Sequence, residues 1–200
     1  FPTRRSSDLI ADDCELEDIT EEWSLFHRFH EDQDSRRSQR LGMQGEDLWL
    51  PRGDTPGWPE NLEMTRAEFE LLKIRSLYPE TDKVITGNEF PSELGLDRWA
   101  VDFHKGCYLG QEIVSRIESV GRTKRELVCF SAEDDLSEGQ KIFHESAEIE
   151  IRQGIRDEQG GQFFGLGLRS ESKRPPEDDE ATKTVHIHAE ERLMRSATNH

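Results

Sequence analysis

The first fifty residues contain one pattern typical of a helix and several typical of strands. In ITEEWSLFHRF, aromatic and aliphatic residues recur three and four positions apart, which predicts a helix capped by Asp18 or Thr20. The preceding CELEDI predicts a short strand. Strand-like runs around Arg40 and over Asp47–Leu50 predict a hairpin that passes through Gly45.

A second predicted helix has clear signals at both ends. Thr65 and Glu68 form a capping box at its start, and the helix must end before Pro79. Proline and glycine residues over Pro51–Pro59 predict a surface loop ahead of it, and Lys83–Thr86 predicts a last strand. The resulting order is β-α-β-β-α-β, a ferredoxin-like split unit.

Beyond Gly121 the pattern changes to short apolar runs between glycine-rich turns. These runs predict strands over Leu127–Ala132, Lys141–Ser146, Glu148–Ile155, Gln162–Arg169 and Val185–Glu190. Short antiparallel strands of this kind predict a small β-barrel, so the predicted fold class is α+β. The polar, proline-containing stretch Ser170–Lys183 predicts a loop.

Composition narrows the class of protein. The chain has 200 residues, of which 32% are hydrophobic and 34% charged, with a formal net charge of -17. No run approaches the roughly 18 apolar residues of a membrane span, so we expect no membrane association. The acidic balance argues against direct nucleic-acid binding, which needs lysine and arginine to displace counterions.

The cysteines indicate neither a disulfide framework nor a metal site. Cys14, Cys107 and Cys129 form an odd set without CxxC or Cys/His spacing, which suits a reducing, cytoplasmic compartment. Because iron-sulfur clusters usually need about four thiolates, we expect no metal or cluster bound by this chain alone. Any iron-sulfur chemistry would belong to a partner.

The most specific motif is KGCYLGQE, Lys105–Glu112, called the octet below. Gly110 suits a helix N-cap, and Glu112 falls in the first turn, where the helix dipole favours a carboxylate. Cys107 therefore lies just ahead of a helix start and two residues from Lys105, and both features would raise its thiolate fraction. The alternative is packing, because free cysteine is among the most often buried residue types.

The octet closely resembles the signature of the YgfZ family, the folate-binding relatives of the glycine-cleavage T-protein. The segments CELEDITEEWSLFH, LLKIRSLYP, EFPSELGL and EIVSRIESVGRTKREL also resemble the family, so the similarity runs from about residue 12 to residue 170. It implies a GcvT-like folate-binding domain over residues 10–120 and a C-terminal β-barrel over 121–195. FPTRRSSDL, residues 1–9, resembles a translated sequencing adapter, and we expect a scar that replaces a natural N-terminal domain.

The resemblance implies a tetrahydrofolate ligand, or a one-carbon derivative of it, and a role in assembling or repairing iron-sulfur enzymes, including ones that modify tRNA. Its partners would be folate and iron-sulfur enzymes or assembly factors. On this interpretation Cys107 is a nucleophile or redox-active thiol, and Lys105 holds the thiolate or binds an anionic group. The turn around them is shaped by the rest of the octet, namely Gly106, Tyr108, Gly110, Gln111 and Glu112.

Other readings stay open. GRTKR, with Arg122, Lys124 and Arg125, is either a solvated turn or an anion site for a folate glutamate tail or a phosphate. Lys73, Arg75 and Leu77 depart from the family pattern, so no folate contact is carried over from that helix. The rival function is a tetrahydrofolate-dependent aminomethyltransferase like the T-protein, although the octet favours an accessory protein over a catalyst. A structural remnant without ligand is the third reading.

Overall fold

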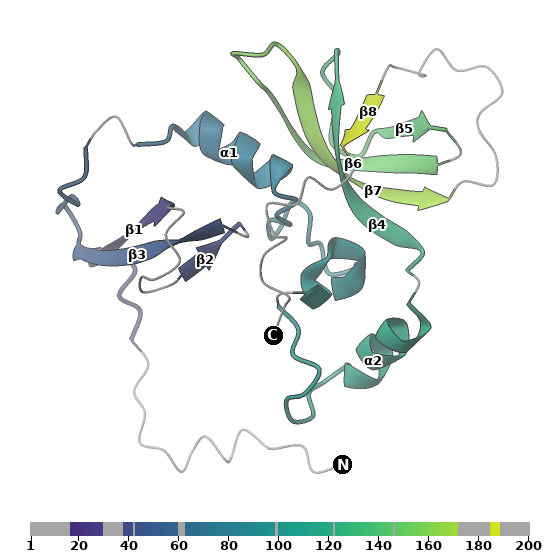
Figure 1. Ribbon diagram of the computed structural model, residues 1–200, viewed down its shortest axis with the longest axis horizontal. Coiled ribbons are helices and arrows are strands. Elements are labelled where there is room, and N and C mark those ends of the chain that lie inside the picture. Colours follow the sequence, from purple (N-terminus) through teal and green to yellow (C-terminus); the bar gives the residue numbers. More distant parts are fainter. Residues whose placement is uncertain are drawn as a thin grey trace. The chain divides into compact units, whose positions relative to one another are not determined.

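The computed structural model describes residues 17–29, 38–41, 43–59, 63–98, 100–121, 123–145, 147–171 and 185–188 (Figure 1). Residue contacts divide the chain into two units. Unit 1 holds the described residues of Phe1–Glu63 with Gly106–Leu109, and unit 2 holds those of Met64–Lys105 and Gly110–His200. This division does not test the predicted domain boundaries after residues 9 and 120, which stay predictions. The expected scar, Cys14 and most of the predicted 170–183 loop lie outside the described residues.

Unit 1 contains a three-stranded antiparallel sheet in the order β1-β3-β2. Its strands are β1 (Trp23–Phe29), β2 (Ser38–Arg40) and β3 (Met43–Pro51). In the pairing of β1 with β3, Leu25 lies opposite Trp49. Phe26 of β1 contacts the segment that follows β3, where its ring and the ring of Trp58 pack edge to face with 6.4 Å between centroids.

The predicted helix over ITEEWSLFHRF is wrong, because its second half is strand β1. Every residue of β1 pairs with one of β3, from Trp23 opposite Pro51 to Phe29 opposite Gly45. Aromatic residues fit a pleated surface well, so this pairing outweighs the helical spacing. Asp18 and Thr20, which were predicted to cap this helix, form a turn instead. In it the Thr20 amide donates to Asp18 Oδ1 at 3.0 Å.

The predicted hairpin is present, but its turn lies elsewhere. Strands β2 and β3 pair antiparallel with Arg40 opposite Met43, so the chain reverses between these two residues. Gly45 lies inside β3, where it pairs with Phe29 on one side and Ser38 on the other. Sequence pattern thus identified both strands and misplaced their connection.

In unit 2, helix α1 (Arg66–Arg75) confirms the predicted capping box. Thr65 Oγ1 accepts from the Glu68 amide at 3.2 Å, and Glu68 Oε2 accepts from the Thr65 amide at 2.8 Å. The helix ends before Pro79, as predicted.

The strand predicted over Lys83–Thr86 is wrong. These residues form a turn, in which the amides of Val84 and Ile85 both donate to the Glu80 carbonyl at 2.9 and 3.1 Å. Their donors are therefore satisfied locally, and one isolated bridge joins Thr81 to Ile85. Among the described elements, the β-α-β-β-α-β order is not confirmed.

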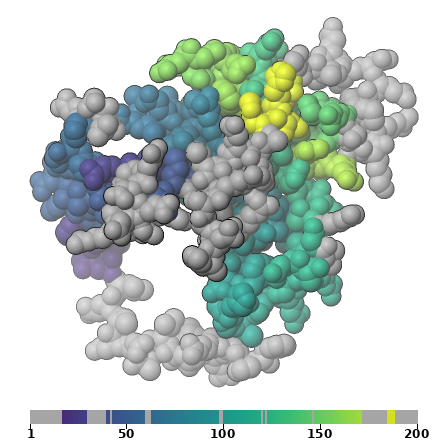
Figure 2. Space-filling view, viewed as in Figure 1, coloured from purple at the N-terminus to yellow at the C-terminus, as the bar shows by residue number. Residues whose placement is uncertain are grey.

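Two short 3₁₀ turns, η3 (Pro91–Leu94) and η4 (Leu96–Arg98), follow, and then helix α2 (Gln111–Val120). The rest of unit 2 is an antiparallel five-stranded sheet in the order β5-β6-β7-β4-β8. Its strands are β4 (Arg125–Ala132), β5 (Lys141–His144), β6 (Ala147–Arg156), β7 (Phe163–Glu171) and β8 (Val185–His188). All five predicted strands are confirmed, and β8 reaches the surface in the space-filling view (Figure 2).

The sheet curls into half of a barrel, and among the described strands β5 and β8 are its open edges (Figure 1). Alternation along β4 sends Phe130 to one face and Cys129 to the other. The Phe130 face holds the core Val128, Phe130, Ala132, Leu136, Ile142, Ile149, Ile151, Phe163 and Val185. The other face packs on α1 and η3 through Ile74, Val84, Leu94, Leu127, Cys129, Phe164, Leu166 and Leu168.

Candidate functional site

The octet leads directly into helix α2. Gly110 is the N-cap with φ of 86°, a left-handed conformation that glycine adopts without a Cβ penalty. Gln111 begins the helix, and Glu112 lies in its first turn. The predicted turn and helix start are confirmed, although Gly110 supplies no side chain to cap the first amides.

The two described cysteines have opposite environments. Cys107 is exposed, whereas Cys129 is buried in β4. Burial raises the pKa of the Cys129 thiol to about 11, and the charge of Arg75 only partly opposes this. Among the described residues Cys107 is therefore not part of the core, whereas Cys129 is.

The other octet residues divide by exposure. Lys105, Gly106 and Glu112 are exposed, and Tyr108 and Gln111 are half-buried. Immediately before the octet, the His104 amide donates to Asp102 Oδ1 at 2.8 Å and forms a local turn. The roles predicted for Lys105 and Cys107 stay predictions.

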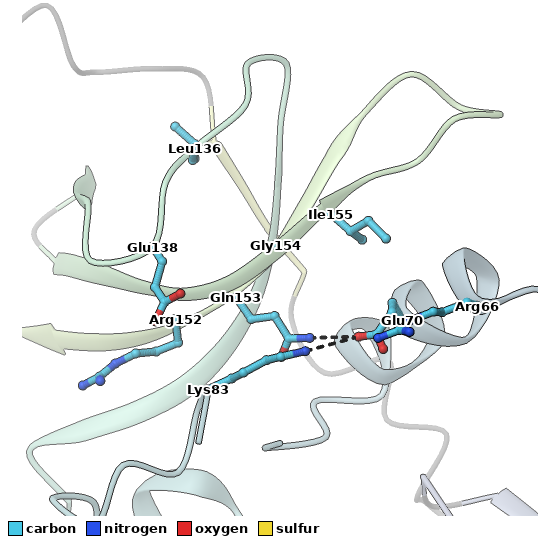
Figure 3. Close-up of a pocket in the computed structure, with 9 residues that line it drawn as sticks. All are labelled: Arg66, Glu70, Lys83, Leu136, Glu138, Arg152, Gln153, Gly154 and Ile155. Atoms are coloured by element: carbon cyan, nitrogen blue, oxygen red, sulfur yellow. Dashed lines mark hydrogen bonds and ion pairs between the residues drawn. The ribbon is translucent and has the colours of Figure 1, made fainter. Parts of the chain in front are cut away.

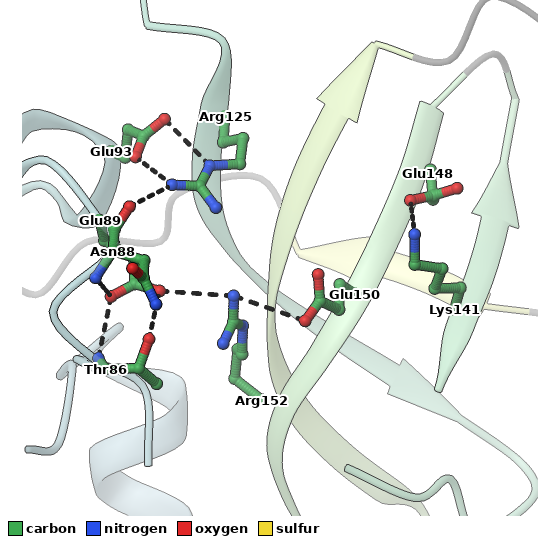
Figure 4. Close-up of polar contacts among 9 residues, drawn as sticks. All are labelled: Thr86, Asn88, Glu89, Glu93, Arg125, Lys141, Glu148, Glu150 and Arg152. Atoms are coloured by element: carbon green, nitrogen blue, oxygen red, sulfur yellow. Dashed lines mark hydrogen bonds and ion pairs between the residues drawn. The ribbon is translucent and has the colours of Figure 1, made fainter. Parts of the chain in front are cut away.

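The predicted basic cluster has a partner for one of its members. Arg125 makes two hydrogen bonds to Glu93, Nε to Oε1 at 3.1 Å and Nη2 to Oε2 at 2.7 Å, and a third from Nη2 to the Asn88 carbonyl at 2.9 Å (Figure 4). Lys124 is exposed, and Arg122 lies outside the described residues. The proposed anion site stays a prediction, and Arg125 is held by a carboxylate from another element.

Glu93 is the residue that sequence reasoning missed in this contact. Burial works against its ionisation, but hydrogen bonds from Arg125 and from the Phe90 amide outweigh that effect and hold the pKa of Glu93 below its ordinary value. The signal available in the sequence was the pair of acids in EFPSELGL, a segment otherwise apolar around its proline.

Glu89 makes the second link between this segment and the sheet. Its fully buried side chain accepts from Thr86, from the amide at 2.8 Å and from Oγ1 at 2.9 Å, and lies 3.4 Å from Arg152 Nη2 (Figure 4). Burial opposes its ionisation, yet the hydrogen bonds from Thr86 and the charge of Arg152 hold the pKa of Glu89 below its ordinary value. These two carboxylates tie the segment that precedes the octet to strands β4 and β6.

A second polar network surrounds Lys73 on α1. Lys73 Nζ lies 2.8 Å from Glu70 Oε1 and 2.9 Å from Glu80 Oε2, and only 8% of its side chain is exposed. Burial disfavours the ammonium, but the two carboxylates outweigh it and raise the pKa of Lys73. Through these contacts Lys73 links helix α1 to the turn that contains Glu80.

Two features are absent from the described residues, a cluster of metal ligands and a membrane-spanning helix. No three side chains among His, Cys, Asp and Glu come together there as ligands for a metal ion. No helix in this part of the chain has both the length and the apolar character needed to cross a bilayer.

Comparison with known proteins gives relatives over part of the chain, although no protein-family model matches it. The tRNA-modifying protein YgfZ of Colwellia psychrerythraea is 34% identical over 70 residues, which cover 34% of this chain and 22% of that protein. The mitochondrial iron-sulfur cluster assembly factor IBA57 homolog of Cryptococcus neoformans is 30% identical over 87 residues, covering 42% and 23%. The homolog of Dictyostelium discoideum is 32% identical over 120 residues, covering 56% and 29%.

The matched stretches span less than a third of the length of these relatives. These relatives confirm the resemblance to the YgfZ family that the octet indicated. The IBA57 homologs are named as mitochondrial, so the predicted cytoplasmic location stays a prediction.

Proposed function

We propose that this chain is part of a YgfZ-like accessory factor that supports the assembly or repair of iron-sulfur enzymes, including ones that modify tRNA. The names of its relatives support this function, since one is called tRNA-modifying and the others iron-sulfur cluster assembly factors. The observation that carries the proposal is the exposed Cys107 within the octet. Its partners would be iron-sulfur enzymes or assembly factors.

In this proposal Cys107 is the reactive thiol, acting as a nucleophile or redox-active group. An exposed thiol is accessible to a partner protein, whereas Cys129 is not. Lys105, two residues earlier, would hold the thiolate or an anionic group of the partner by its charge. Gln111 and Glu112 would keep the turn in place, because they begin helix α2.

A tetrahydrofolate ligand is the second part of the proposal, and it rests on the family resemblance. Unit 2 has a pocket lined by helix α1, the turn after it, the β4–β5 loop and strand β6, and this lining offers no aromatic ring on which a pterin could stack (Figure 3). Its lining carries charged side chains on several walls, and no aromatic side chain is among its described residues. We therefore assign folate to none of these residues and derive no step through it.

The test of the proposed function is rescue of cells that lack their own YgfZ-type factor. We expect the chain to restore the activity of an iron-sulfur enzyme and Cys107→Ala to abolish the rescue, while the variant accumulates to the same level. Glu118→Gln, an exposed change on α2, is the matched control and should rescue fully. Full rescue by Cys107→Ala would contradict the role of the thiol.

Calorimetric titration of tetrahydrofolate and its formyl derivative, with a one-carbon transfer assay alongside, tests the ligand. Binding without transfer is expected from an accessory factor. Transfer of a one-carbon unit would favour the rival aminomethyltransferase. Absence of binding would contradict the folate proposal and leave the rescue experiment to decide on Cys107.

A further inference from the structure

Strand β1 forms one edge of the unit 1 sheet, and no other described strand pairs with its outer side (Figure 1). The strand is regular, since every residue from Trp23 to Phe29 pairs with β3 without a shift in register. Edge strands are usually protected from further pairing by a proline, a bulge or a charge. β1 contains no proline or bulge, and its arginine, Arg28, is bound to Glu46 of β3. Its outer side is therefore open to another strand.

The pairing with β3 defines which backbone groups of β1 point outward. Pro51 lies opposite Trp23 and has no amide hydrogen. The Arg52 amide donates to the Glu22 carbonyl at 2.7 Å, so Trp23 and Pro51 form a non-hydrogen-bonded pair. Such pairs alternate with hydrogen-bonded ones along an antiparallel ladder. The backbone groups directed away from β3 therefore belong to Trp23, Leu25, His27 and Phe29.

These outward groups lie beside uncovered apolar side chains. Trp23 is 39% exposed and Leu25 is 37% exposed, and Trp49, opposite Leu25 on β3, is 57% exposed. The opposite face of β1 differs, because there Phe26 packs against Trp58. An open backbone edge with apolar side chains beside it is the arrangement that binding by strand addition uses.

The sequence of β1 is complementary to itself in one antiparallel register. With Phe26 opposite Phe26 of a second copy, Trp23 lies opposite Phe29 and Leu25 lies opposite His27. Each outward residue then faces an outward residue of the other copy, so the outward amides and carbonyls all gain partners. This register also gives the longest overlap, because Phe26 is the middle residue of the strand.

The side chains are compatible with the same register. Arg28 lies opposite Ser24, so no charge faces a charge of like sign across the two copies. Trp23 and Phe29 form an aromatic cross-strand pair at each end of the ladder, which is a favourable combination. A two-fold axis through Phe26 generates both ends at once and closes the assembly as a dimer.

We propose that a second copy of this chain binds to the open edge of β1 and forms a two-fold symmetric dimer. One sheet then continues across both copies, with β1 of each at its centre. The proposal is independent of the proposed function, since β1 contains no residue of the octet. The formal net charge of -17 on each copy opposes association, so the dimer should weaken as salt is lowered.

Sedimentation equilibrium of the full chain tests the dimer. At 0.15 M salt, where the screening length is about 8 Å, we expect the mass to rise with concentration from 23.2 kDa towards twice that value. Leu25→Pro removes an outward amide and leaves the hydrogen bonds to β3 in place, so it should weaken the dimer at least about tenfold. Trp49→Thr changes the exposed face without changing the edge, and this control should stay within about twofold of the unchanged chain.

Cysteine crosslinking tests the register. The background is Cys14→Ala with Cys107→Ala, which removes the other accessible thiol of the octet. A mixture of Ser24→Cys chains and Arg28→Cys chains should form disulfide-linked dimers at least about tenfold faster than either variant alone, because only the mixture places two thiols directly opposite each other.

Three results would overturn the proposal. They are a monomer at every concentration, a mass that grows beyond the dimer, and a dimer that Trp49→Thr disrupts while Leu25→Pro does not. Equal crosslinking in the mixture and in the single variants would overturn the register. If Leu25→Pro fails to fold by circular dichroism, the crosslinking rates decide alone.

Discussion

The octet with helix α2 and the five-stranded sheet of unit 2 place the same kinds of side chain in opposite environments. Leu109 is fully exposed and Ile113 is 54% exposed, whereas Phe130 and Leu166 of the sheet are completely buried. The cysteines follow the same division, since Cys107 is exposed and Cys129 is not.

This difference separates the side chains that stabilise the fold from those that are accessible to reagents and partners. Burial of apolar area in the sheet stabilises the fold by about 25 cal/mol per Å². Side chains of the octet contribute little of that burial, so their residue types are not explained by packing. The proposed reactive role of Cys107 requires this exposure, because a partner or reagent must reach the thiol.

The largest effect should come from the core of the sheet. Phe130 has no exposed surface, and a Cβ at Gly165 on the neighbouring strand would overlap its ring. We expect Phe130→Ala to lower the free energy of unfolding by about 3–5 kcal/mol, because the lost ring leaves a cavity. Urea unfolding followed by circular dichroism measures it. Leu109→Ala is the matched control, expected within about 0.5 kcal/mol of the unchanged protein; a large loss there would mean that the octet is packed.

The thiols should differ nearly as much in reactivity. With a pKa of about 11, Cys129 has on the order of one thiolate in ten thousand at pH 7, and it is also shielded from reagents. We expect Cys107 to be alkylated by iodoacetamide at least about 100-fold faster. Mass spectrometry of digested samples follows both sites, and Cys107→Ala should lose the fast reaction. Equal alkylation rates of Cys107 and Cys129 would contradict the difference in exposure between the octet and the sheet.

The smallest effect concerns the ion pair that ties the segment before the octet to β4. Glu93→Gln leaves Arg125 without its carboxylate, and we expect a loss of about 1–3 kcal/mol in the free energy of unfolding at pH 7. Glu118→Gln on α2 is the control, expected within about 0.5 kcal/mol. Urea titrations of both variants measure the difference.

At acidic pH, Glu93→Gln should no longer lower the free energy of unfolding. Because the pKa of Glu93 lies below its ordinary value of 4.5 in the folded chain, its stabilisation is present above that value. As the pH falls below 4.5, the unfolded chain takes up a proton first, and the stabilisation disappears through the folded pKa. The unchanged protein and Glu93→Gln should therefore converge at low pH, and a constant difference would show that Glu93 acts through packing.

Much of unit 2 could be predicted from local pattern. The capping box of α1, the start of α2 after Gly110 and the five strands of the sheet were all identified, because each depends on residues within a few positions of one another. The octet was identified by its residue types alone. The exposure of Cys107, in contrast, could not be read from sequence, since either a packed or an exposed thiol fits the same letters.

The sequence by itself determined the features for which local signals agree, namely the helix caps, the turns, the alternating strands and the octet. Tertiary structure decided the rest. WSLFHRF has helical spacing, yet it is a strand because β3 supplies a partner for every residue. Arg125 is bound to Glu93, 32 residues away, and the β6 bulge at Arg152 depends on its register with β7. These features arise from pairing between distant segments, whose energies no local pattern encodes.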